Sequence, residues 1–111
     1  MSPTRVRTIR FEQETIALIA EAIGATVSLA PFQLPGAAVH QVMISGPENR
    51  PATMLTLWPS LRRVDAITAG AAVVFTRIVS VQVVEGAEVL FRRETGEYLV
   101  VTSQGKVIVR A

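Results

Sequence analysis

The chain has 111 residues and a net charge of +2, so its size is that of one domain, which can form a core without disulfides or metal. It contains no cysteine, which excludes disulfides, thiolate metal sites and cysteine nucleophiles. The sequence pI is about 9.9 because ten of the eleven basic residues are arginine, which stays charged far above neutral pH. A charge of +2 is therefore a weak sign of nucleic-acid binding.

The chain is unusually apolar for a soluble monomer. Half of its residues are hydrophobic, and its mean hydropathy is +0.40. Such a chain must either bury its apolar surface very efficiently or share some of it with a partner.

Residues 1–10 are polar and basic, with arginine at positions 5, 7 and 10. We expect a flexible basic arm or a short strand here, followed by a single α+β domain over residues 11–111. The apolar run Ile16–Ala30 is too short to span a bilayer and is interrupted by Glu21. Acidic residues Glu12 and Glu14 precede it, which a signal peptide avoids. The sequence therefore predicts a cytoplasmic protein with no membrane segment.

The segment Glu12–Ile23 has the period of an amphipathic helix. Apolar side chains recur at Ile16, Ile19 and Ile23, which places them on one stripe, and Gly24 can adopt the left-handed conformation that ends a helix. We predict one helix, lying with its single apolar stripe against a sheet.

Short strands separated by turns follow the predicted helix. Alternating apolar and polar residues predict strands, ended by prolines and glycines, at Ala25–Ala30, Ala37–Ser45, Thr53–Trp58 and Leu61–Ile67. The most polar loop of the chain, Gly46–Pro51, separates the second and third of these. The valine-rich segment Ala71–Arg110 is interrupted by glycine turns and predicts a meander of about four strands. From the helix and this segment we expect ten largely buried side chains, namely Ile16, Ile19, Ile23, Val73, Phe75, Val81, Val89, Phe91, Leu99 and Val101.

Together these elements predict an α+β fold: a strongly bent antiparallel sheet, as a roll or half-open barrel, with one N-terminal amphipathic helix. The cadence of VVFTRIVSVQVVEGAEVLFRRETGEYLVV loosely resembles PH-like rolls, over the C-terminal half at most. Those rolls normally end in a long helix, whereas this chain ends in a predicted strand, Lys106–Arg110. No family is identified from this resemblance.

Few residues could carry chemistry. The chain has one histidine, His40, and one aspartate, Asp65, so a catalytic triad with a serine can be assembled only on paper. No metal-ligand spacing and no glycine-rich phosphate loop occurs. We therefore predict no catalytic residues, no metal, no cofactor and no enzymatic activity, and interpret His40 as a partly buried structural residue.

The arginines are candidate anion-binding residues. Two adjacent pairs occur, Arg62-Arg63 and Arg92-Arg93. Adjacent residues on a strand point to opposite faces, so only one arginine of each pair could join the N-terminal basic residues in a shared patch. The candidates for anion or nucleic-acid binding are Arg5, Arg7, Arg10, Arg63 and Arg92. The competing interpretation is a solvated surface with ion pairs to Asp65, Glu94 and Glu97.

The favoured function is a non-enzymatic binding or assembly module that recognises a protein partner or itself. An anion or nucleic-acid binder and a small-ligand pocket protein or enzyme remain alternatives. Both strand parities of the meander are partly apolar, so we predict a homodimer or higher closed oligomer. The candidate interface residues are Trp58, Lys106, Ile108 and Arg110, the last three on a possible edge strand.

Overall fold

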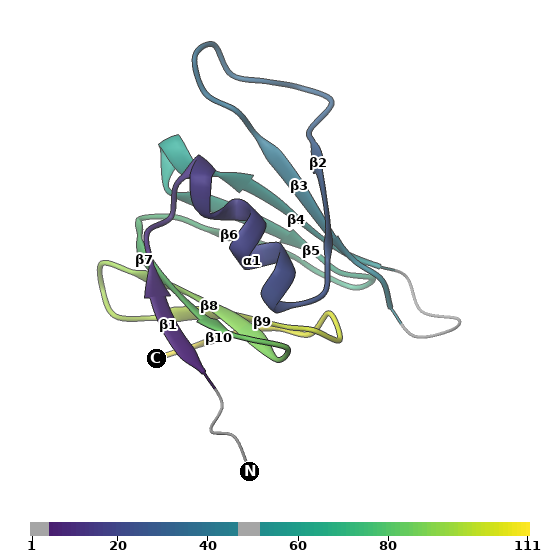
Figure 1. Cartoon of the computed structure of the whole chain (residues 1–111), viewed down its shortest axis with the longest axis vertical. Coiled ribbons are helices and arrows are strands. Elements are labelled where there is room, and N and C mark those ends of the chain that lie inside the picture. The colour runs from purple at the N-terminus through teal and green to yellow at the C-terminus, as the bar shows by residue number, and fades with distance from the viewer. Residues whose placement is uncertain (1–4, 47–51) are drawn as a thin grey trace.

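Two antiparallel sheets and one short helix form the fold in a computed structural model, which describes residues 5–46 and 52–111 (Figure 1). Each sheet has five strands. Most of the predicted polar loop Gly46–Pro51 and the first four residues of the predicted basic arm lie outside the described residues. None of the described helices is long and apolar enough to cross a membrane.

The predicted N-terminal helix is confirmed. It begins as a 3₁₀ turn, Gln13–Thr15, and continues as α1, Ile16–Ala22. The hydroxyl of Thr15 accepts a hydrogen bond from the backbone N–H of Glu12 at 3.2 Å and so satisfies one of the N–H groups at the start of the helix. Gly24 follows with a φ of +64°, the left-handed conformation that glycine adopts without steric cost.

The first sheet is a meander in chain order, β2-β3-β4-β5-β6. Its strands are β2 (Thr26–Leu29), β3 (His40–Ile44), β4 (Thr53–Trp58), β5 (Arg63–Ile67) and β6 (Ala72–Phe75). The four strands predicted between residues 25 and 67 are therefore all present, with ends shifted by a few residues. The remaining strand of this sheet, β6, comes from the valine-rich segment.

The second sheet has the order β1-β7-β8-β9-β10. Its strands are β1 (Val6–Ile9), β7 (Ile78–Val84), β8 (Glu88–Arg93), β9 (Tyr98–Thr102) and β10 (Val107–Arg110). The segment Ala71–Arg110, predicted as a meander of about four strands, forms five: β6 joins the first sheet, and β7 to β10 form a meander in the second. Of the two alternatives for the N-terminal residues, the strand is the one found over Val6–Ile9, where it pairs with β7.

The strong bending predicted for a single sheet is not confirmed, because the strands divide into two sheets. The chain crosses between them at Arg77, a non-glycine residue with a φ of +60°, and Ile78 then donates its N–H to the carbonyl of Arg62. A second link joins the hydroxyl of Thr53 on β4 to the carbonyl oxygen of Gly105 at 2.7 Å. In Figure 1, α1 lies in the middle of the molecule between the two sheets.

The hydrophobic core lies between the inner faces of the two sheets and α1. Of the ten side chains predicted to be buried, nine are buried and Val73 is partly buried against the core. The nine are Ile16, Ile19, Ile23, Phe75, Val81, Val89, Phe91, Leu99 and Val101. Periodicity therefore identified the core-facing side of both the helix and the strands.

Candidate functional site

The candidate arginines lie on several different surfaces. Arg7 is on β1, and the cleft that it lines with Arg5 is on the α1 side of the second sheet. Arg92 is on the outer face of that sheet, in register with Ser80 and Tyr98. Arg63 is on β5 of the other sheet. The structure therefore brings Arg5 and Arg7 together but separates them from Arg63 and Arg92.

Ion pairs occupy three arginines. Arg63 donates two hydrogen bonds to the carboxylate of Asp65, at 2.6 and 2.9 Å, and this hydrogen bonding and the charge of Asp65 raise the pKa of Arg63. Arg62 lies 4.0 Å from Glu94, and Arg93 lies 3.6 Å from Glu97. These are the acidic partners expected for a solvated, ion-paired surface.

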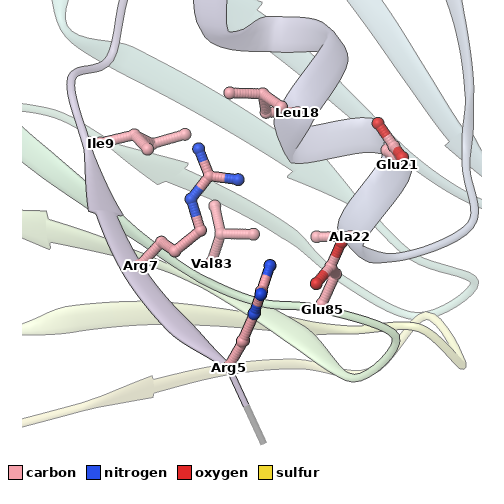
Figure 2. Close-up of a pocket in the computed structure, with 8 residues that line it drawn as sticks. All are labelled: Arg5, Arg7, Ile9, Leu18, Glu21, Ala22, Val83 and Glu85. Carbon is pink, nitrogen blue, oxygen red and sulfur yellow. The ribbon is translucent and has the colours of Figure 1, made fainter.

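The cleft between β1 and α1 combines both signs of charge. Figure 2 shows the side chains of Arg5 and Arg7 pointing toward α1, with Glu21 on the helix and Glu85 on the facing turn. About 20 Å³ of the cleft can hold the centre of a water molecule, which is room for about one water. This cleft therefore has no room for a metabolite-sized ligand.

Two wider clefts lie beside Phe11 and Pro59. They measure about 240 and 310 Å³ and share Phe11, Glu12 and Pro59 in their walls. The second also includes Arg10 and Arg62. Both are open to solvent, and neither contains His40 in its walls.

His40 and Asp65 lie on opposite faces of one sheet. His40 is in register with Leu57 on the core side, whereas Asp65 is in register with Thr56 on the outer side and holds Arg63. A triad that needs both residues therefore cannot form. Among residues 5–46 and 52–111, no three acidic or histidine side chains gather closely enough to hold a metal ion.

Trp58 belongs to a small cluster on the outer face of the β2–β6 sheet. Its ring lies 5.2 Å from the ring of Phe32 and 5.5 Å from the guanidinium carbon of Arg63. The indole Nε1 is buried without a hydrogen-bond partner in the described part of the chain. Phe32 and Arg63 therefore both pack against the Trp58 ring.

The same outer face also carries apolar side chains farther along the strands. Met43, Met54 and Ile67 lie in one cross-strand row, and Val74 lies in the next row, opposite Asp65. Met43, Ile67 and Val74 are exposed, and no described element covers them. On the outer face of the other sheet, Leu90 and Val100 are only 6% and 3% exposed, although they lie outside the core cluster.

Four strand edges are free in the described part of the chain, namely those of β1, β2, β6 and β10. Three of the four candidate interface residues lie at the β10 edge, where Ile108 is exposed between Lys106 and Arg110. Arg7 lies on the β1 edge. By contrast, β2 and β6 contain no charged residue.

Sequence reasoning missed β2 as a candidate site. Val27 and Leu29 lie on the same side of the sheet as the core-facing residues Val42 and His40, with which they are in register. They are nevertheless 38% and 64% exposed. One signal was available: no Asp, Glu, Lys or Arg occurs between Glu21 and Glu48. Such a long uncharged segment leaves an edge strand without the charges that normally protect it.

The chain matches no family model, no curated protein and no solved structure. The loose similarity to PH-like rolls therefore has no support from a related protein. What these surfaces do has to be inferred from their own geometry.

Proposed function

We propose that this protein is a non-enzymatic binding or assembly module that recognises a second copy of itself or another protein. The observation that carries the proposal is the β2–β6 sheet, whose outer face exposes Met43, Ile67 and Val74 and whose two edge strands are uncharged. Exposed apolar side chains that gather on one face are typical of interaction sites. A cytoplasmic location, expected from the sequence, belongs to this proposal.

Self-recognition is the form of the proposal that can be tested directly. A small soluble chain that buries leftover apolar surface against its own copy usually does so as a two-fold dimer. The apolar outer face and the free edges of the same sheet can both contribute, because neither is covered within the described residues.

Light scattering during size-exclusion chromatography tests this proposal over a range from about 1 to 200 µM, where small interfaces associate. We expect the measured mass to rise from that of one chain, 12.0 kDa, toward that of two. A mass of one chain at every concentration would refute self-recognition.

The nucleic-acid alternative has less support. The candidate arginines are divided among different surfaces, and Arg63 is already held by Asp65. The cleft near Arg5 and Arg7 also contains Glu21 and Glu85, whose charges oppose phosphate binding.

A further inference from the structure

We infer that two copies of this chain pair through their β2 strands, antiparallel about a two-fold axis at Ser28, and so join two five-stranded sheets into one. This inference rests on the proposed function and adds the route of assembly and its register. The inference is supported by the hydrogen-bonding groups, the side chains and the lack of charge at the free edge of β2.

The backbone hydrogen bonds identify which β2 residues face the free edge. Ala30 donates its N–H to Val39 at 3.0 Å, and these two residues are opposite each other when the register of β2 and β3 is extended by one residue. Hydrogen-bonded and non-hydrogen-bonded pairs alternate in an antiparallel ladder. Ser28 therefore bonds to β3, while Val27 and Leu29 direct their N–H and C=O groups toward the free edge.

The same two residues carry exposed apolar side chains. Leu29 is 64% exposed and Val27 is 38% exposed, on one side of the strand. Antiparallel pairing about Ser28 sets Val27 opposite Leu29 of the second copy, twice by symmetry. Each of these pairs exchanges two hydrogen bonds and brings two apolar side chains into cross-strand contact.

The neighbouring residues select this register over the adjacent ones. If the second strand slides by two residues so that Leu29 lies opposite Ala25, the pair needs the N–H of Ala25, which already bonds to the carbonyl of Ala20 at 2.9 Å. A shift the other way sets Pro31 opposite Val27, and proline has no N–H to donate. Only pairing about Ser28 gives the edge-facing N–H and C=O groups of Val27 and Leu29 hydrogen-bond partners in both copies.

Charge separates the β2 edge from the β10 edge. Symmetric pairing of β10 about Ile108 sets Lys106 opposite Arg110 of the second copy, and like charges directly opposite each other destabilise a strand pair. The segment from Ala22 to Pro47 contains no Asp, Glu, Lys or Arg. Strand β6 is also uncharged, but Arg77 follows it closely, and it is the rival that the experiment has to exclude.

A single engineered thiol tests the register, because the chain has no cysteine of its own. Ser28 faces Ser28 of the second copy as a non-hydrogen-bonded pair, whose Cα separation of about 4.5 Å suits a disulfide. We expect mild oxidation of Ser28→Cys to give a covalent dimer that a reductant reverses. The matched control is Thr26→Cys, an exposed neighbour that lies opposite Ala30 and should form at least roughly tenfold less dimer.

Proline substitutions test the edge. Leu29→Pro removes an N–H that makes no bond to β3 and blocks an incoming strand, so we expect it to raise the dimer dissociation constant by at least about tenfold. The matched control is Ala72→Pro on β6. Thr68 donates its N–H to the carbonyl of Ala71, and Ala72 is opposite Ile67 in the next pair of the ladder. By the same alternation Ala72 also faces a free edge, and its substitution should leave the dissociation constant unchanged.

The outcomes distinguish the two levels of the proposal. A wild-type chain that stays monomeric refutes self-recognition and the β2 pairing with it. A wild-type dimer that Leu29→Pro leaves intact, and that Ser28→Cys does not cross-link, refutes the β2 pairing alone. Dissociation by Ala72→Pro instead assigns the interface to β6 and also overturns the inference.

Discussion

Replacing Phe91 by alanine tests the central packing of the fold. Phe91 lies on β8, is 0% exposed, and is in register with the buried Val81 and Leu99 on the two flanking strands. Its ring also packs edge-on against Phe11, at 5.7 Å between centroids and an interplanar angle of 75°. The side chain therefore contacts the middle of the second sheet and the segment that leads into α1.

The expected loss of stability follows from this environment. Truncating a fully buried phenylalanine costs about 3–5 kcal/mol through lost transfer free energy and the cavity left behind. Loss of the edge-on contact with Phe11 adds to the lower part of that range, because aromatic pairs contribute about 0.5–1.5 kcal/mol beyond their buried area. We therefore expect Phe91→Ala to cost about 4 kcal/mol, which is a large fraction of the free energy of unfolding of a small domain.

Urea denaturation followed by the fluorescence of Trp58, the single tryptophan, measures this change. With a denaturant dependence of about 1–3 kcal/mol/M for small proteins, the midpoint should fall by roughly 2 M. The control is Phe32→Ala, whose ring is 47% exposed and which should shift the midpoint much less. An unchanged midpoint and slope for Phe91→Ala would show that this side chain does not pack as described.

Three further results are expected. Gly105→Ala should destabilise the fold by about 1–3 kcal/mol, because Gly105 has a φ of +86° and a Cβ there would lie 2.7 Å from the hydroxyl of Thr53. The control Gly86→Ala, at a φ of +75° with open space around the new Cβ, should lower the midpoint of thermal unfolding less. Fluorescence anisotropy with labelled DNA and RNA should show weak or no binding at physiological salt, and sub-micromolar binding that weakens steeply with salt would instead favour the nucleic-acid alternative. The hydrogen bonds to Asp65 and its charge raise the pKa of Arg63 above its ordinary value, so the contribution of this ion pair to stability is fully present below that ordinary value and is lost only as the pH rises through the raised one. The change in thermal unfolding between pH 7 and pH 10 should therefore be the same for wild type and Arg63→Gln.

Local patterns predicted the elements well, because each depends on a few neighbouring residues. The stripe of Ile16, Ile19 and Ile23 identified the helix, and alternation identified the faces of β4 and β8. The division into two sheets was not predictable in this way. It depends on the crossing at Arg77, where an ordinary residue adopts a positive φ and no glycine or proline marks the change of direction.

The candidate surfaces were harder to predict than the core. Alternation shows that Val27 and Leu29 share one side of a strand, but whether that side is covered depends on where α1 and the opposite sheet end. The arginines present the same difficulty. Alternation shows that only one arginine of each adjacent pair can join a given face, but not that Arg63 and Arg92 belong to different sheets. Long-range placement decides both questions.

The pairing of β1 with β7 has a consequence for the order of folding. These two strands are neighbours in space but stand at opposite ends of the β2–β6 meander in the chain. A ribosome that makes the chain from the N-terminus therefore releases β1 long before its partner exists. The β2–β6 sheet, in which every strand pairs with the next one in the chain, can form before β7 is made, because local contacts form before distant ones. Strand β1 therefore stays without its partner until β7 has been made, and its pairing with β7 then joins the N-terminal segment to the second sheet.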